Sequence, residues 1–225
     1  MHFSLIYGYE CRQSKCMKVE LDEKNWNTAI SLPVCRMFCG DSIGTVWPKP
    51  TGPLSFDSSL LHIDRNAIEF EMPPYRHQAN LWDSNRERFM DLIENKVPNT
   101  KLLKNEGHPM KISIKLETDS TDNDETPRLT LDTDESYELE IKTSDDHEVL
   151  ATINAKNYFG ARHGLETLNQ LIVYDDIRRE LQVVSNATIH DKPEFKWRGL
   201  LLDTSRNFYS VKAIKRTLGK WEKFI

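Results

Sequence analysis

The residue best suited to chemistry in this sequence is Arg206, which lies in a polar run that follows an apolar stretch. Residues 199–202 are apolar at successive positions, which is typical of a parallel strand buried on both faces. Residues 203–207 would then lie at the carboxyl end of that strand, where α/β barrels hold their functional residues. A guanidinium offers five donors in a fixed geometry and no acceptor, so Arg206 suits a carboxylate or a pair of hydroxyl groups. The alternative is a structural ion pair with a neighbouring carboxylate.

Three other polar residues near these elements favour structural roles. Asp203 ends the predicted strand, where it can bind a metal or act as an acid, but backbone amides or a nearby Arg more often hold such a residue. Arg198 lies at the opposite end of the strand, where barrel residues usually serve stability. His163 flanks the apolar face of a predicted helix, which favours a hydrogen-bonded histidine at the edge of the core.

The cysteines form a local cluster: Cys11, Cys16, Cys35 and Cys39 are the four in the chain. Their spacing is compatible with two disulfides, of open connectivity, or with a four-thiolate zinc site. We favour disulfides, because the C-x2-C pairs of zinc ribbons are absent. Disulfides indicate an oxidising compartment. The single sequon, at Asn186, is compatible with secretion and is a candidate N-glycosylation site.

Several catalytic classes lack support in the sequence. The seven histidines are scattered, with no H-x-x-x-H pair, so metal catalysis is not indicated. The phosphate-binding and dinucleotide-binding glycine motifs and the G-x-S-x-G nucleophile motif are also absent. We therefore expect no cofactor and no metal. Carboxylates are abundant, but the pattern alone assigns no acid and nucleophile.

Charge and hydropathy exclude further classes. The net charge is −5, and residues 117–148 hold 13 acidic residues against two basic ones. The rest of the chain has only a mild basic excess, without the clustered stripe that nucleic-acid binding requires. The acidic block is most simply a solvated face, with cation binding as the alternative. No apolar run approaches the roughly 20 residues of a membrane span, and no signal peptide is evident at the N-terminus.

Periodicity predicts an α+β domain over residues 54–193, after a Cys-containing arm over residues 1–53. Alternating apolar residues indicate strands, and apolar residues three and four apart indicate two amphipathic helices, the second capped by Asn157. The predicted strands lie in residues 60–72 (a hairpin or bent pair), 111–118, 129–131, 137–141 and 149–153, and the helices in residues 77–97 and 157–172. This order favours an antiparallel sheet with helices on one face.

Residues 194–225 follow a different pattern. The apolar run at 199–202 is followed by Ser210, which is placed to cap a helix with an apolar stripe at Val211, Ile214, Leu218 and Trp221. Strand, loop and helix make one β/α unit, the first of a (β/α)8 TIM barrel. One unit cannot close a barrel.

Residues 195–210 resemble the first barrel strand of family 20 β-N-acetylhexosaminidases. Residues 158–171 resemble the helix of that family's N-terminal domain, and residues 35–40 with 47–50 resemble its insect members. The resemblance covers the chain up to about Leu218. It implies that Arg206 binds hydroxyls of a terminal N-acetylhexosamine.

The resemblance also implies a substrate-assisted retaining mechanism, in which the 2-acetamido oxygen of the substrate attacks the anomeric carbon. The family's catalytic Asp-Glu pair belongs to a later barrel strand. The Asp-Glu dipeptides of this chain begin at Asp22, Asp124 and Asp134, all in the N-terminal region. We therefore expect no catalytic residue in this chain and no hydrolysis by the chain alone.

The resulting prediction is a β-N-acetylhexosaminidase that removes terminal GlcNAc or GalNAc from chitooligosaccharides or N-glycans. The resemblance implies a secreted or lysosomal location and a homodimer formed through the catalytic domain. One alternative is a non-catalytic fragment that binds glycan or pairs with full-length subunits. Another is a chain that does not persist as a folded protein, because the apolar surface of residues 194–225 would be exposed.

Overall fold

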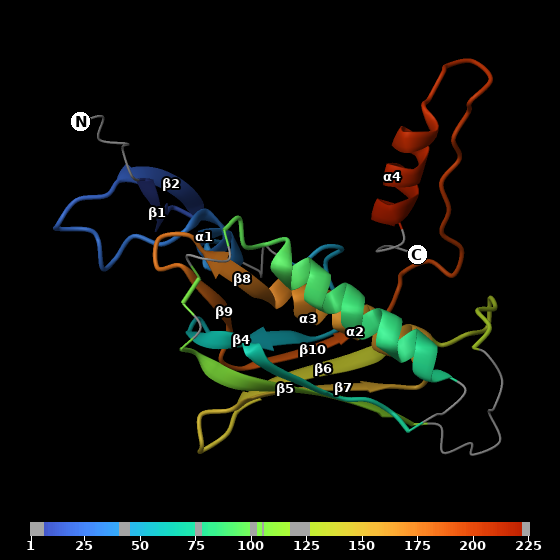
Figure 1. Ribbon diagram of the computed structural model, residues 1–225, viewed down its shortest axis with the longest axis horizontal. Coiled ribbons are helices and arrows are strands. Elements are labelled where there is room, and N and C mark those ends of the chain that lie inside the picture. The colour runs from blue at the N-terminus through green and yellow to red at the C-terminus, as the bar shows by residue number, and fades with distance from the viewer. Residues whose placement is uncertain are drawn as a thin grey trace.

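The computed structural model describes residues 7–40, 46–74, 78–99, 103–104, 106–117 and 127–221. A curled sheet forms the body of the molecule, with two long helices across one of its faces (Figure 1). The elements in chain order are β1 (Tyr7–Arg12), β2 (Lys15–Glu20), α1 (Leu32–Phe38), β3 (Leu54–Phe56), β4 (Leu60–Glu71), α2 (Ala79–Glu94), β5 (His108–Leu116), β6 (Tyr137–Thr143), β7 (Val149–Ala155), α3 (Tyr158–Leu171), β8 (Ile172–Asp175), β9 (Glu180–Val184), β10 (Ala187–Asp191) and α4 (Val211–Trp221).

The large sheet has eight strands in the order β3-β10-β6-β7-β5-β4-β9-β8 among the described residues. The expected antiparallel arrangement holds for most neighbours, but β5 lies parallel to both β4 and β7. The β4–β5 pair is parallel because α2 connects the two strands as a crossover, whereas β6 and β7 are joined by a short turn and lie antiparallel. The domain is α+β with helices on one face, as predicted, and its sheet is mixed.

A bent corner curls the sheet. Strands β3 and β4 follow each other along one side of the corner, and β9 and β10 follow each other along the other, because Phe56 pairs with Ala187 and Leu60 pairs with Val184. Between these pairs, residues 57–59 face only residues 185–186. The extra residue is the mark of a β-bulge, which bends a strand and increases its twist.

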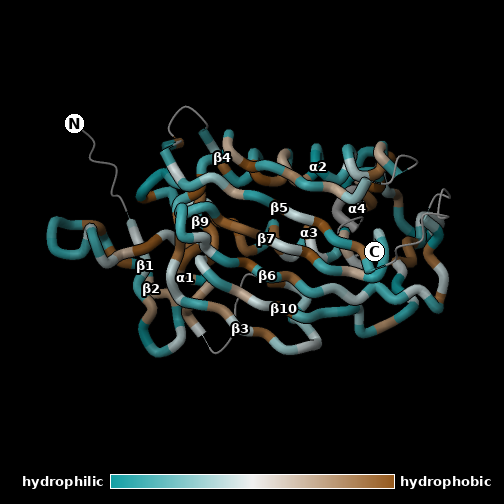
Figure 2. Tube along the Cα trace, turned by 90° about the horizontal axis from the view of Figure 1, so that it is seen from below, coloured by the Kyte–Doolittle hydropathy of each residue, from teal (hydrophilic) through white to brown (hydrophobic). Residues whose placement is uncertain are grey.

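Alternation along the central strands separates a buried face from a solvated one. Ile112, Leu139 and Ile153 are fully buried beneath the helices, whereas their neighbours Lys111, Glu138 and Asn154 are only partly covered. Viewed from the side opposite the helices, the strands show this mixture of polar and apolar positions (Figure 2). The period of two fixes the register, because a shift by one residue would turn the apolar set to water.

Helix α3 packs closely on the sheet because glycines occupy two of its contact positions. An ideal Cβ at Gly160 would lie 2.4 Å from the carbonyl oxygen of Ser136, and one at Gly164 would lie 2.6 Å from the Cγ2 atom of Ile153. The helix begins at Asn157, whose side chain accepts hydrogen bonds from the backbone N–H groups of Phe159 and Gly160, as predicted. The N-cap and the glycines therefore fix the start of α3 against the end of β7.

Helix α2 lies beside α3 and is held to it by mixed contacts. Its buried residues are Trp82, Phe89 and Ile93, and the ring of Trp82 packs edge-on against Tyr158 at 5.0 Å between centroids. Lys96 Nζ donates to the carbonyl oxygen of Ile172 at 2.7 Å, which satisfies a backbone acceptor at the carboxyl end of α3. None of the helices in the described part of the chain is long and apolar enough to cross a membrane.

Some sequence expectations on this domain were wrong. Residues 60–72, expected as a hairpin or a bent strand pair, form one long strand, Leu60–Glu71, with an irregularity between Ile63 and Ile68 in its pairing with β5. Residues 129–131 form no strand, and Leu129 and Leu131 are exposed. Helix α1, strands β3, β8, β9 and β10 and the β1–β2 hairpin were not predicted.

We expect Gly160→Ala to destabilise the protein. Alanine gains about 1 kcal/mol over glycine in a helix, but the added methyl group would overlap the Ser136 carbonyl oxygen, and overpacking costs about 1–3 kcal/mol. Because the clashing atom belongs to the backbone and cannot turn aside, the cost falls in the upper part of that range, and urea unfolding should show a net loss of about 1–2 kcal/mol.

Gly199→Ala is the matched control, because an ideal Cβ at Gly199 would lie 3.8 Å from its nearest neighbouring atom. The free energy of unfolding of this variant should change by less than about 0.5 kcal/mol. An equal effect of the two substitutions would contradict the close packing of α3.

Candidate functional site

The segment that carries Arg206 leaves the sheet and contains no strand. We use the term arm for this segment, residues 194–221. Residues 199–204 have no strand partner in the described part of the chain, and Leu201 is 95% exposed. This corrects the expected buried strand at 199–202, and the physical reason is that a parallel strand requires neighbouring strands for its hydrogen bonds. The predicted helix is present as α4, and Ser210 Oγ accepts from the backbone N–H of Ala213 at 3.2 Å. Figure 1 shows the arm projecting from the body of the sheet domain.

Arg206 lies on this arm with its guanidinium open to solvent. Its side chain is 87% exposed, and its Nε atom lies 3.4 Å from Oδ2 of Asp203. Asp203 Oδ1 in turn accepts from the backbone N–H groups of Ser205 and Arg206. Asp203 therefore orders the turn, in line with the structural role expected for it. The ligand-binding role of Arg206 stays a prediction.

A buried ionic joint forms where the arm meets the sheet domain. We use the term joint for Glu135, His163 and Arg198. Glu135 Oε2 lies 2.8 Å from His163 Nε2 and 2.7 Å from an Nη atom of Arg198. The three side chains are only 8%, 16% and 18% exposed. The structural roles expected for His163 and Arg198 agree with this geometry.

The joint holds Glu135 ionised. Burial alone raises the pKa of a carboxyl group, but hydrogen bonds from His163 and Arg198 and the charge of Arg198 outweigh burial and lower the pKa of Glu135 below its ordinary value of 4.5. Sequence reasoning missed Glu135, which stood out only as half of an Asp-Glu dipeptide. Its partners are 28 and 63 residues away, and no periodic signal links them.

A cavity of about 340 Å³ borders the joint. Trp47 and Phe195 stand at its edge, each 70% exposed, and the Trp47–Pro48 peptide is cis. The backbone N–H of Trp47 donates to Gln170 Oε1 of α3 at 2.7 Å, which holds the tryptophan loop on the helix. The cavity therefore lies between the sheet domain and the first residues of the arm.

A second network of hydrogen bonds lines this cavity. The hydroxyl of Tyr137 lies 2.5 Å from Thr167 Oγ1 and donates to Asp191 Oδ2 at 3.2 Å. Asp191 Oδ1 also accepts from the backbone N–H and the hydroxyl of Thr51. Burial and the nearby Asp191 carboxylate raise the pKa of Tyr137 far above its ordinary value, so Tyr137 remains a neutral donor. The network ties the end of β10 to the loop before β3.

A second cavity, of about 460 Å³, shares Tyr137 and Asp191 with the first and is also lined by residues of the solvated face of the sheet. Glu138 is among its lining residues, and its carboxylate accepts from Asn154 Nδ2 at 3.4 Å and lies 3.5 Å from His190 Nε2. Other acidic residues of the acidic block pair with lysines, as Asp134 does with Lys156 at 2.7 Å. Residues 118–126 of the block, and with them the Asp-Glu dipeptide at Asp124, lie outside the described residues.

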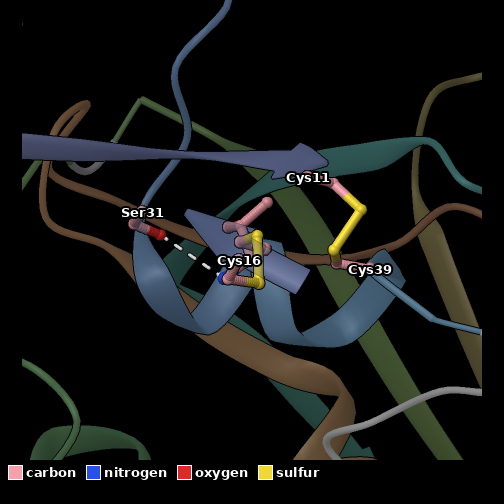
Figure 3. The surroundings of a disulfide bond; sticks show 6 residues. Cys11, Cys16, Ser31 and Cys39 are labelled. Atoms are coloured by element: carbon pink, nitrogen blue, oxygen red, sulfur yellow. Dashed lines mark hydrogen bonds between the residues drawn. A yellow bond between two sulfur atoms is a disulfide. The ribbon is translucent and has the colours of Figure 1, made fainter. Parts of the chain in front are cut away.

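The four cysteines form two disulfides, Cys11–Cys39 and Cys16–Cys35. Both bridges join the β1–β2 hairpin to α1, whose N-cap Ser31 accepts from the backbone N–H of Val34 (Figure 3). The prediction of disulfides is confirmed. The alternative four-thiolate zinc site does not fit this structure, because all four sulfurs are bonded in pairs.

Within the N-terminal segment, residues 7–40, backbone pairing joins β1 to the residues before α1, and one arginine joins this segment to the sheet domain. Tyr9 and Ile30 exchange hydrogen bonds, and Arg178 reaches from the turn after β8 to the carbonyl oxygens of Asn27 and Ala29. Arg178 also donates to the buried carboxylate of Asp175 at 2.9 Å. The disulfide-linked segment is therefore fixed on the domain, far in sequence from the Arg206 arm.

Glu135→Gln should remove part of the acid sensitivity of the fold. The folded-state pKa of Glu135 is lowered, so its stabilisation is fully present above the ordinary pKa of 4.5 and is lost as the pH falls through the lowered value. Urea unfolding should show a clear loss of stability for the variant at neutral pH, and a smaller difference from the parent well below pH 4.5. A difference that stays constant with pH would contradict an ionised Glu135 in the joint.

Two family models match the chain. One, described as "beta-acetyl hexosaminidase like", matches residues 46–171. The other, "Glycosyl hydrolase family 20, catalytic domain", matches residues 195–220. The first covers the sheet domain through the end of α3, and the second covers the arm that begins at the joint.

Similar proteins point to the same family. A chitooligosaccharidolytic β-N-acetylglucosaminidase of Bombyx mori is 38% identical over 95% of this chain and 35% of its own length. A probable β-hexosaminidase of Drosophila melanogaster is 31% identical over 94% of this chain and 36% of its own length. The chain therefore spans about a third of the length of these relatives.

Solved structures share the fold. A chitobiase of Flavobacterium johnsoniae superposes with a TM-score of 0.53 at 24% identity, over 80% of this chain and 25% of its own. An inactive variant of an exo β-N-acetylglucosaminidase of Vibrio harveyi gives 0.54 at 19% identity, over 80% and 24%. Because the hexosaminidase-like match spans more than half of the residues and the catalytic-domain match begins where the arm leaves the sheet, this chain belongs to the β-N-acetylhexosaminidases of glycoside hydrolase family 20.

Proposed function

We propose that this chain is the N-terminal part of an enzyme that removes terminal N-acetylhexosamine, GlcNAc or GalNAc, from chitooligosaccharides or N-glycans. The observation that carries the proposal is 38% identity over 95% of the chain with a relative whose name describes action on chitooligosaccharides. The chain covers about a third of that relative. The catalytic Asp-Glu pair of the family would then belong to residues beyond those of this chain.

The proposed roles of the three segments follow the change in structure along the chain. Residues 1–53 form the disulfide-linked arm, residues 54–193 the sheet domain and residues 194–225 the start of the catalytic barrel. Support comes from the family matches, which end at residue 171 and resume at residue 195. The sheet domain would carry no reacting group, and its role would be to hold the first barrel residues.

Arg206 is the proposed substrate-binding residue of this chain. Its guanidinium is exposed and oriented by Asp203, so donors remain open to hydroxyl groups of a terminal sugar. The reaction would proceed with retention of configuration by attack of the substrate's own 2-acetamido oxygen, and Arg206 would hold the sugar for that attack. Arg206 forms no bond to the reacting centre in this scheme.

The alternative function is that of a non-catalytic fragment that binds glycan or pairs with full-length subunits. Exposed apolar side chains on the arm favour the pairing role, because Trp197, Leu201 and Phe208 are each more than 80% exposed and would be buried against further strands or a second subunit. A homodimer through the catalytic domain and a secreted or lysosomal location are part of the main proposal. The two disulfides support an oxidising compartment.

Hydrolysis of a chromogenic β-GlcNAc substrate tests the main proposal. We expect no turnover by the 225-residue chain and clear turnover by a version extended with the remaining barrel of the Bombyx mori relative. In the extended protein, Arg206→Gln should lower kcat/KM by roughly 10- to 100-fold, the range for a lost charged hydrogen bond. Lys196→Gln is the control, because Lys196 is exposed and lies 3.8 Å from Asp132, whose side chain is also exposed.

Turnover by the short chain would show that it contains its own catalytic acid, against the proposal. An extended protein that folds without hydrolysing the substrate would favour the non-catalytic alternative. Unchanged kinetics in the Arg206 variant would remove Arg206 from the binding site while leaving the assignment of the enzyme intact.

N-glycosylation of Asn186 is a separate prediction. Asn186 is exposed at the bulged corner between β9 and β10, and Thr188 completes the sequon two residues later. When the chain is directed through the secretory pathway of a eukaryotic host, peptide N-glycosidase should remove one glycan's mass from it. Asn186→Gln should abolish the glycan and Thr188→Ser should keep it. A secreted chain of unmodified mass would contradict the prediction.

A further inference from the structure

The joint brings together residues from three separate parts of the chain. Glu135 precedes β6, His163 lies on α3 and Arg198 lies on the arm, seven residues after the end of β10. One oxygen of Glu135 is the acceptor for both neighbours. The joint is therefore the place where the sheet domain receives the residues that match the catalytic domain.

Arg198 joins the arm to the sheet domain and also closes a turn within the arm. One Nη atom donates to Glu135 Oε2 at 2.7 Å, and the other donates to the carbonyl oxygen of Phe195 at 2.6 Å. The first contact crosses from the arm to the sheet domain, and the second closes a turn within the arm. A planar guanidinium can make both at once, whereas a lysine ammonium lacks this fork.

Burial gives this contact more weight than other ion pairs of the arm. Lys196 and Asp132 are 74% and 98% exposed at 3.8 Å, and such surface pairs are worth little. At Glu135 and Arg198, by contrast, water is largely excluded. Removing one partner there leaves the other charge buried without its counter-charge, which strongly destabilises the contact.

His163 directs the shared carboxylate. Its Nε2 atom faces the same Oε2 atom that Arg198 binds, so a residue of the sheet domain orients the carboxylate. His163 also lines the cavity beside Trp47 and Phe195. The receptor for Arg198 is thus built entirely from the sheet domain.

We propose that the joint is an interdomain contact, in which Glu135 and His163 of the sheet domain bind Arg198 and fix the first residues of the arm. We call this contact the clasp. Arg198 lies before the apolar run and Arg206 lies after it, so the clasp holds the end opposite to the proposed sugar-binding residue. In barrels, that opposite end serves stability, and the loops after the strands serve chemistry. The clasp therefore anchors the catalytic part without contacting its substrate, and it does not depend on the proposed activity.

Limited digestion of the 225-residue chain with chymotrypsin tests the clasp and carries its own internal control. The side chains of Phe195, Trp197 and Phe208 are all exposed, but only the first two flank the clasp. Arg198→Gln should speed cleavage after Phe195 and Trp197 by at least about tenfold, because local opening becomes easier. Cleavage after Phe208 should keep its rate.

Four further variants sharpen the test. Arg198→Lys should give an intermediate rate, because it keeps the charge and loses the fork. Glu135→Gln should accelerate cleavage at the same two bonds, and its combination with Arg198→Gln should add little, since both remove one interaction. Lys196→Gln should not change the rates.

The proposal would be overturned if cleavage after Phe195 and Trp197 stayed unchanged in the Arg198 and Glu135 variants. It would also be overturned if the double variant showed the product of the two single accelerations. Equal acceleration at Phe208 would also overturn it, because it would show a global loss of folding. If Arg198→Gln does not fold, the milder His163→Gln serves in its place, with acceleration confined to Phe195 and Trp197 as the supporting result.

Discussion

The close contact between α3 and the central strands is the constraint on which the rest of the structure depends. Gly160 and Gly164 allow the helix to approach the backbone before β6 and the side chain of Ile153. That approach places His163 within hydrogen-bonding distance of Glu135 and Thr167 within reach of Tyr137. A larger separation would break both contacts, so the joint and the network at Asp191 exist only because two residues of one helix have no side chain.

Much of the sheet domain could be predicted, because its signals are local. The alternation of β5, β6 and β7 and the Asn157 cap indicate the central strands and α3 directly. The β1–β2 hairpin was missed because its turn residues, Gln13 and Ser14, adopt positive φ without the Asn or Gly that normally marks such a turn. The opposite error occurred at Leu129 and Leu131, where a strand was predicted and none forms. The alternation there covers too few residues, and both side chains lie at the surface.

The site was less predictable, because its contacts span long distances in sequence. Arg206 could be singled out from the polar run after an apolar stretch, and its local pairing with Asp203 matches the ion pair expected as its alternative role. Glu135 could not be connected with Arg198, since charged residues carry no period that would show two of them meeting 63 positions apart. The apolar run at residues 199–202 has the composition of a buried strand. A strand also needs neighbouring strands to pair with, and residues 199–202 have none in the described part of the chain.

The nested disulfides bear on how the chain must mature. Cys11 and Cys16 face each other directly in the β1–β2 hairpin, yet each is bonded to a cysteine of the α1 region. Cys11 and Cys16 can therefore compete for each other. Oxidation before α1 has docked on the hairpin would trap a Cys11–Cys16 bond. Correct bridging requires that helix and hairpin meet first, or that an isomerase rearranges the early product. The pairing of these four sulfurs therefore distinguishes native material from material oxidised too soon, and a map of the bridges would reveal the latter.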